Sequence, residues 1–533
     1  MWHAACVRLS SMKSLLHVLW STLLALAIAP RGAAAQGGGP GVAFQPGFHQ
    51  VLRNYIWRND ITTFRIKIPI GRSGNRVRVS FKAGEADGRI HAANIALAGA
   101  RGELASDPTP LTFNGSPEAR IAPWQRITSD PVNFTVSFGA EVYVSFEADW
   151  AIAASTINAF PDSFTWLGSY STQRSPPAGT PWMRAVVNTI DVEGPSDRAL
   201  VAIGDSITEG YVSGDVGDYI SSHDDYRDAW PAVAQSILRV PFANAGASAQ
   251  GTDDALAQLS VDVLALQGIT DCVVLIGTND VHALTPPQLE SKLTALFDRL
   301  RPFCRVWAGT LPPISRPSDD YATIVSRRME VNDWIRHRAT VADVIDFESV
   351  LAAPGDVNSF REGLGSGDGI HPSVQGQHAM GVEAARVLAP PTLQSLSPNS
   401  GPTAGGTIIT LSATGLKPGA TALVGGATAP DVVISAPSSM RITAPVHEAG
   451  SVDVSVKNPD GQSATLPAAF RYQDPNTPPD SQPPPTPSAK QGCNTTDFGL
   501  VDPVIFAAIL LTIFCRFGSQ NSTCRRWRQS SSL

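Results

Sequence analysis

The sequence predicts a multidomain chain in which a central α/β domain lies between two β-rich modules. The chain has 533 residues, which is more than one hydrophobic core usually supports. From about Ala199 to Leu388, apolar runs of strand length alternate with helical periodicity, which predicts a parallel sheet covered on both faces by helices. The segments on either side alternate polar and apolar residues between Gly, Asp and Pro, a pattern typical of β-sandwiches.

Residues 1–35 have the pattern of a signal peptide. A basic start precedes an apolar run from Leu15 to Ala29, and Ala33-Ala34-Ala35 forms a small-residue cleavage site. A membrane-spanning anchor is the alternative, but Pro30 interrupts the run. We therefore expect the mature chain to begin at Gln36 and to be secreted or held at the cell surface.

The composition excludes several classes of protein. The formal net charge is −7, and Lys and Arg form no long cluster, so nucleic acid is not an expected partner. Charged residues make up only 16% of the chain while Gly and Pro are abundant, which favours turn-rich β modules over coiled coils.

The N-terminal β module is predicted over residues 44–190. Three of its segments alternate in polarity, namely Thr63–Ile68, Val77–Phe81 and Val142–Phe146. They predict a β-sandwich or a jelly roll. Such a module can bind carbohydrate, yet the sequence shows no clear aromatic platform, so a role in packing against the neighbouring domain is equally open.

The α/β domain is predicted over residues 195–389. We expect strands at 199–203, 273–276, 306–311 and 342–347, and helices at 230–238, 287–300 and 324–337. In a parallel sheet of this kind, active-site groups collect at the carboxyl ends of the strands.

Two cysteines of this domain are candidates for a disulfide. Cys272 and Cys304 each open an apolar run, and the two runs are predicted to be neighbouring strands. An oxidising compartment can therefore join them. Two buried free thiols are the alternative.

The candidate nucleophile is Ser206. Gly204-Asp205-Ser206 follows the first predicted strand of the α/β domain, where the chain turns into a helix. Free N–H groups and the helix dipole favour negative charge at that position, so the Ser206 amide is also a candidate oxyanion donor.

The run from Asp368 to His371 offers, on one loop, a base for the hydroxyl and a carboxylate that orients the base. Taken alone, His371 would be interpreted as a surface histidine.

Asn279 follows another predicted strand, in the run Ile276-Gly277-Thr278-Asn279-Asp280. An Asn side chain at this edge of the sheet can donate to an oxyanion, and loss of one such donor typically lowers the rate by about 10²–10³. A structural role is the alternative, since Asn and Asp often cap helices or form turns after strands.

Together, these three blocks resemble those of the SGNH (GDSL-like) hydrolase family. The resemblance covers about residues 199–388 and extends to Ala229-Trp230-Pro231 and Gly309–Pro313. It implies a flavodoxin-like αβα sandwich and ester hydrolysis without metal or cofactor. It also implies an oxyanion hole made by the Ser206 amide, a Gly amide and the Asn279 side chain.

The chain departs from the family pattern at the second of these donors. The family usually places a Gly five residues after an Asn, and Ala249 stands at that distance from Asn244. Ala249 can donate only if its φ is negative, so either its amide is the donor or the loop shifts and Gly246 donates instead. We favour Ala249.

No metal ion is expected to bind. Asp215 and Asp218, together with His223-Asp224-Asp225, match no ligand set in their spacing. An acidic surface loop over the mouth of the pocket is the favoured interpretation.

A second resemblance concerns residues 391–473. The run from Ser397 to Pro402, followed by Gly405-Gly406-Thr407, resembles the opening of an IPT/TIG module. The resemblance implies an immunoglobulin-like β-sandwich that serves as a spacer or an adhesive unit.

The remaining segments are not predicted to fold as domains. Residues 474–492 form a Pro-rich, extended linker. Residues 493–533 combine a short apolar run with basic residues. A sorting tail, a weak membrane anchor and a disordered end are three interpretations, ranked in that order, and the first two imply association with the cell envelope or membrane.

The sequence thus predicts an exported serine esterase that forms an acyl-enzyme on Ser206. Export and the flanking β modules favour O-acetyl groups on polysaccharides as the substrate. A lipase or short-chain carboxylesterase is the first alternative. A catalytically silent surface adhesion protein is the second.

Overall fold

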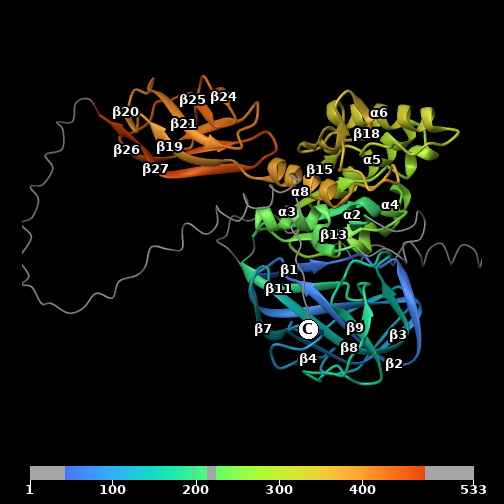
Figure 1. Ribbon diagram of the computed structural model, residues 1–533. Coiled ribbons are helices and arrows are strands. Elements are labelled where there is room, and N and C mark those ends of the chain that lie inside the picture. Colours follow the sequence, from blue (N-terminus) through green and yellow to red (C-terminus); the bar gives the residue numbers. More distant parts are fainter. Residues whose placement is uncertain (1–41, 196, 213–223, 475–533) are drawn as a thin grey trace, which may run out of the picture. The chain divides into compact units, whose positions relative to one another are not determined.

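The computed structural model describes residues 42–195, 197–212 and 224–474 (Figure 1). The predicted signal peptide, nearly all of the Pro-rich linker and the C-terminal tail lie outside the described residues. Within the described ranges, no helix is both long and apolar enough to cross a bilayer.

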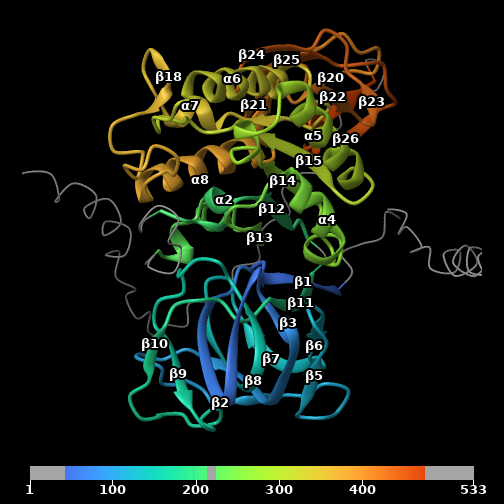
Figure 2. The ribbon, with the colours of Figure 1, turned by 90° about the vertical axis from the view of Figure 1, so that its right-hand side faces the viewer.

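The N-terminal module is built from strands alone, and Figure 2 shows the long strands β2, β3 and β8 running along it. The strands are β1 Val42–His49, β2 Asn54–Pro69, β3 Gly74–Leu97, β4 Thr109–Leu111, β5 Ala119–Ile121, β6 Arg126–Thr128, β7 Val132–Val136, β8 Glu141–Ala154, β9 Ser163–Leu167, β10 Thr180–Trp182 and β11 Thr189–Pro195.

Strand β3 belongs to both layers of this module. Its first half pairs with β11, β6 and β7, and its second half pairs with β8, β5 and β4. The register shifts between Ala83 and Gly88, and irregularities of this kind bend a strand. Apolar side chains of both layers meet in one core, so a sandwich forms. The module extends past residue 190, because β11 pairs with β1 and β3.

The α/β domain is built on a parallel five-stranded sheet. The strands are β12 Leu200–Gly204, β13 Phe242–Gly246, β14 Asp271–Leu275, β15 Arg305–Gly309 and β16 Val344–Ile345, in the order β13-β12-β14-β15-β16. The sequence analysis did not single out β13, because its residues FANAG are mostly small and lack the β-branched side chains that mark the other strands.

Helices connect these strands. They are α2 Ser206–Glu209, α3 Trp230–Leu238, α4 Thr252–Asp262, α5 Pro286–Leu300, α6 Tyr321–His337, α7 Phe347–Leu351 and α8 Val374–Leu388, with 3₁₀ turns η1 Tyr226–Asp228 and η2 Asp280–His282 and a hairpin of β17 Ala352–Ala353 and β18 Asp356–Phe360. Helix α8 packs with α3 and α7, and α5 packs with α4 and α6. Because the strand order reverses beside β12, right-handed crossovers put α3 and α4 on opposite faces, and the crevice opens at the carboxyl end of β12.

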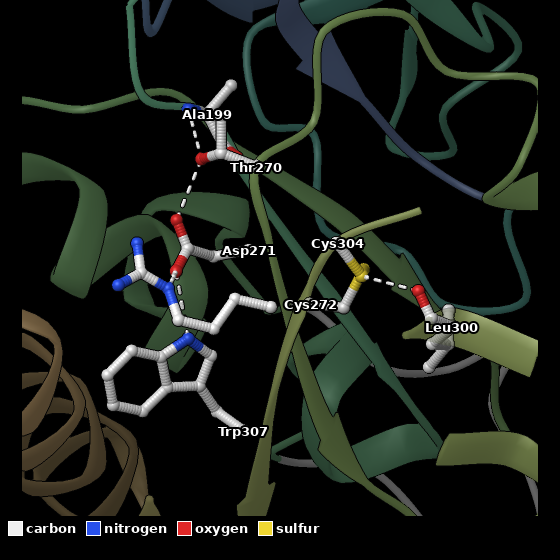
Figure 3. The surroundings of a disulfide bond; sticks show 8 residues. Ala199, Thr270, Asp271, Cys272, Leu300, Cys304 and Trp307 are labelled. Carbon is white, nitrogen blue, oxygen red and sulfur yellow. Dashed lines mark hydrogen bonds and ion pairs between the residues drawn. A yellow bond between two sulfur atoms is a disulfide. The ribbon is translucent and has the colours of Figure 1, made fainter. Parts of the chain in front are cut away.

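Cys272 and Cys304 form a disulfide, with their Cα atoms 5.8 Å apart (Figure 3). It joins the amino-terminal ends of β14 and β15, so it lies at the sheet edge opposite to the one that carries Ser206 and Asn279. The neighbouring Asp271 carboxylate is buried and accepts hydrogen bonds from Arg198, Arg305 and the Trp307 indole. Burial tends to raise the pKa of Asp271, but the hydrogen bond and charge of Arg198, the charge of Arg305 and the hydrogen bond of Thr270 outweigh it and lower that pKa.

The C-terminal module is a second β-sandwich. Its sheets have the orders β19-β21-β25-β24 and β20-β27-β26-β22-β23. The strands are β19 Thr392–Ser397, β20 Ser400–Pro402, β21 Ile408–Thr414, β22 Thr421–Val424, β23 Ala427–Thr428, β24 Val433–Ala436, β25 Ser439–Thr443, β26 Gly450–Lys457 and β27 Ser463–Gln473. A separate apolar core fills the space between the two sheets.

Candidate active site

Ser206 lies at a tight turn between β12 and α2. It is the first residue of this four-residue helix, and the Asp205 side chain caps the helix by accepting from Ile207 N. The turn needs glycine at 204, because a Cβ there would lie 2.2 Å from Thr208 Oγ1 and 2.4 Å from Leu275 O. It also needs glycine at 210, where φ is 106°.

Ser206, His371 and Asp368 form a continuous hydrogen-bonded chain. Ser206 Oγ lies 2.8 Å from His371 Nε2, and His371 Nδ1 lies 2.6 Å from Asp368 Oδ2. Both Ser206 and His371 are buried. The structure therefore brings together the three side chains that the sequence analysis selected as the nucleophile, the base and the carboxylate that orients the base.

The Asp368 loop is organised by its own backbone. Asp368 Oδ1 accepts from the amides of Ile370 and His371, each at 2.8 Å, and from Ser366 Oγ at 3.0 Å. Burial tends to raise the pKa of Asp368, but the hydrogen bond and charge of His371 and these amides outweigh it and hold the pKa well below its usual range. Asp368 is thus an ionised acceptor at neutral pH, as a group that orients an imidazole must be.

Asp205, next to the nucleophile, is a second carboxyl group with a shifted pKa. It is buried, and among the described residues its Oδ2 atom has no hydrogen-bond partner. Burial raises the pKa of Asp205 to about 6, against the opposing effects of the Ile207 amide and the His371 charge. An unpaired carboxylate costs free energy in such a place, so the protonated form is favoured over a wider pH range.

Asn279 lines the same pocket as Ser206 and His371. Its Nδ2 atom donates to Gln250 O at 2.9 Å, which leaves the second amide hydrogen for another acceptor. The capping role considered for this run belongs to Asp280, whose carboxylate accepts from the amide and hydroxyl of Thr252 at the start of α4.

The pocket has a volume of about 520 Å³. Besides Ser206, His371 and Asn279, its walls are Tyr211, Thr278, His282, Ile314, Arg316, Pro317, Ser318 and Ile370. Among the described residues, the walls therefore combine apolar side chains, such as Ile314 and Ile370, with polar and charged ones, such as Thr278 and Arg316.

The two candidates for the second oxyanion amide differ in the structure. The Gly246 amide already donates to Asn244 Oδ1 at 2.9 Å, which argues against Gly246 as the donor. Ala249 has a φ of 62°, not the negative value that the sequence analysis required. It is the third residue of a turn in which Gln250 N donates to Ala247 O, a position that needs positive φ and therefore favours Gly.

A positive φ does not remove the Ala249 N–H, so the requirement of a negative φ was too strict. Among the described residues, this amide has no hydrogen-bond acceptor. Ala249 lines a hollow of its own beside Gln250, whose carbonyl oxygen accepts from the Asn279 side chain. Ala249 thus stays the candidate of the two.

Two residues near the site were not selected from the sequence. The Tyr211 ring packs against the His371 ring with centroids 4.5 Å apart. Gln377 on α8 donates to Ile207 O and accepts from Trp230 N, which ties α8 to the nucleophile helix. In the sequence, the one signal that could have identified either residue is the position of Tyr211, directly after the glycine that ends α2.

The described residues contain no group of His, Cys, Asp or Glu that could hold a metal ion. Asp215, Asp218 and His223 lie outside the described residues. Asp225 caps η1 by accepting from Arg227 N.

Two family models match the chain. The model of the GDSL-like lipase/acylhydrolase family matches residues 202–379, and the IPT/TIG domain model matches residues 391–472. No match was found among curated proteins.

Similar solved structures include a member of the lipolytic protein G-D-S-L family from Veillonella parvula DSM 2008, with 19% identity and a TM-score of 0.28. A carbohydrate acetylesterase from Sinorhizobium meliloti has 17% identity and a TM-score of 0.29. A catalytic mutant of an acetylxylan esterase from Geobacillus stearothermophilus has 19% identity and a TM-score of 0.28. Each match covers 36% of this chain, and 98%, 97% and 93% of the respective structures. Residues 202–379 thus belong to the GDSL-like lipase/acylhydrolase family and residues 391–472 form an IPT/TIG domain, so that the chain is a multidomain serine hydrolase of ester bonds.

Proposed function

We propose that the chain is an exported esterase whose catalytic triad is Ser206, His371 and Asp368. The observation that carries the proposal is the 2.8 Å contact between Ser206 Oγ and His371 Nε2. His371 takes the Ser206 proton as the hydroxyl attacks the ester carbonyl, and Asp368 holds the opposite ring nitrogen as N–H and stabilises the imidazolium. The alcohol leaves with the proton from His371, and the acyl group stays on Ser206. Water activated by His371 then releases the acid.

The tetrahedral oxyanion is held by the Ser206 amide, the Ala249 amide and the Asn279 side chain. Ser206 is the first residue of α2, so its amide has no acceptor within the helix. Asn279 is fixed by its bond to Gln250 O, which orients its second amide hydrogen without needing the substrate. Donors fixed in advance cost no reorganisation when the negative charge develops.

The substrate is an O-acetyl ester of a polysaccharide. Polar and charged side chains such as Thr278, His282 and Arg316 line the pocket beside its apolar walls, and such groups can bind the hydroxyl groups of a sugar alcohol. The alternative, a lipase, needs an apolar surface for its acyl chain. Acetate release from acetylated xylan or pectin, compared with cleavage of phospholipid by the same preparation, separates the two.

Export is supported by two independent observations. The N-terminal 35 residues have the pattern of a signal peptide, and Cys272 and Cys304 form a disulfide of the kind that persists in oxidising compartments. Fractionation of producing cells, with the mature N-terminus sequenced from the exported protein, tests this part.

A fluorophosphonate probe tests the proposed nucleophile. We expect the purified parent to be labelled and Ser206→Ala not to be labelled. Ser318→Ala is the matched control, because Ser318 lines the same pocket and should leave labelling unchanged.

Failure to label the active-site serine in the folded parent would favour the adhesion alternative. Hydrolysis of p-nitrophenyl acetate by Ser206→Ala at the parent rate would refute the assignment of Ser206.

A further inference from the structure

We infer that the N-terminal β module completes the oxyanion side of the active site, and that Glu209 is the positioning residue through which it acts. The inference rests on the proposed function. The sequence analysis left open whether the module only packs against the neighbouring domain. Under this inference, the module also contributes to catalysis.

Glu209 is the last residue of α2, three residues after Ser206, and its side chain is buried. Such a carboxylate needs several hydrogen-bond donors, because burial removes it from water and leaves its charge without compensation. Burial raises the pKa of Glu209, and the hydrogen bonds described below oppose that rise.

Part of the donor set comes from the β module. The Thr156 amide donates to Glu209 Oε1 at 3.0 Å, and the Thr156 hydroxyl donates to Glu209 Oε2. The Ile157 amide adds a longer contact to Oε1 at 3.4 Å. Both residues lie just past the end of β8, so among the described residues every donor that reaches Oε1 comes from the module.

The other part comes from the turn that carries Ala249. The amide and the hydroxyl of Ser248 each donate to Glu209 Oε2 at 2.7 Å. The Ser248 amide also lies 3.2 Å from Thr156 Oγ1. The Thr156 hydroxyl therefore touches both the carboxylate and the turn, and Glu209 ties the nucleophile helix to the residue before the candidate oxyanion amide.

Further contacts of the module fall on the same strand and turn. Gln50, just past β1, forms a β-bridge with Asn244 in β13, and its side chain donates to Gly246 O at 3.3 Å. Arg53 donates to Gln250 Oε1 at 3.5 Å and pairs with Asp262 at the end of α4. The module thus binds along the edge strand β13 and on both sides of Ala249.

Ala249 needs such support, because its left-handed φ of 62° is unfavourable for a residue with a Cβ. A turn held in this conformation by contacts on each side keeps its amide where an oxyanion can use it. Without those contacts, the turn can relax and the amide moves away.

The test compares two Thr→Val variants of the same module in the full chain. Thr156→Val removes the hydroxyl that joins Glu209 and Ser248. Thr63→Val removes a hydroxyl that donates to Gly168 O within the module, away from the active site. We expect Thr156→Val to lower kcat about tenfold with KM changed less than twofold, because oxyanion donors act in the transition state. Thr63→Val should leave kcat unchanged, and Thr156→Ser should restore it.

Several outcomes would overturn the inference. They are an unchanged kcat in Thr156→Val, an equal loss of kcat in Thr63→Val, or a Thr156→Ser variant as slow as Thr156→Val. Kinetics are measured well below the melting temperature of each variant, so partial unfolding is excluded. Failure of the proposed function looks different, since the parent would then show neither esterase activity nor labelling of Ser206.

Discussion

The two sides of the proposed active site, one around the base and one around the oxyanion donors, are built in different ways. The base side is local, because Asp368 holds both the His371 ring and the His371 amide within one four-residue stretch. The oxyanion side is assembled from distant parts, since Asn279, Ser248 and Thr156 come from three separate segments. The comparison teaches that the functional side chains of both sides are visible in the sequence, whereas the distant donors that hold the oxyanion side in place are not.

The strongest way to break the base side is Asp368→Asn. The variant keeps the shape of the loop but lets the side-chain amide face His371 Nδ1, which favours the wrong tautomer. We expect kcat to fall by about 10⁴. A pH–rate profile measured on a chromogenic acetate ester checks this. A loss of less than tenfold would mean that Asp368 is not the partner of the base.

On the oxyanion side, Asn279→Ala should lower kcat by about 10²–10³. The variant removes both the bond to Gln250 O and the hydrogen left for the oxyanion. KM should change little, because the lost interaction forms in the transition state. The assignment of Asn279 would be contradicted if KM rose by the same factor by which kcat fell, or if kcat did not change.

Asp205→Asn tests the shared turn between the two sides. Burial raises the pKa of Asp205 from 3.8 to about 6 in the folded chain, so the protonated form is favoured by folding. Stability should therefore fall as pH rises from about 4 to about 6, and remain lower above that range. Asn mimics the protonated form and can still accept from Ile207 N.

We thus expect Asp205→Asn to melt at a higher temperature than the parent at pH 7, and at the same temperature near pH 4. Thermal melts across this range check the difference. If the difference in melting temperature between variant and parent were the same at all pH values, titration of Asp205 would be excluded as its cause.

The smallest expected effect is that of Ala249→Gly. Glycine adopts positive φ without strain, so the variant should be more stable by about 1 kcal/mol. Activity should be retained, because the backbone N–H is retained. Urea unfolding and kcat measured on one preparation check both points, and a destabilised or inactive variant would show that the Ala249 methyl group matters.

Much of the fold was predictable because periodicity and turn residues are local signals. The strand that precedes Ser206 and the helix over 230–238 were expected within one residue of their observed bounds. Strand β13 was missed because its small residues carry no β signal and its burial comes from neighbours. The extension of the N-terminal module to Pro195 was missed because it depends on pairing between β11 and strands far away in the sequence.

The sequence by itself determined which residues are candidates for the proposed site, since Ser206, Asn279 and the Asp368–His371 loop each follow a recognisable strand or glycine signal. Only the tertiary structure decided which amides remain free to bind an oxyanion. The Gly246 amide is engaged by Asn244, and Ala249 is held at a positive φ. Likewise, the role of Glu209 depends on donors that are 39 and 53 residues away along the chain. The physical reason is that burial and hydrogen-bond partners arise only when separate segments pack together.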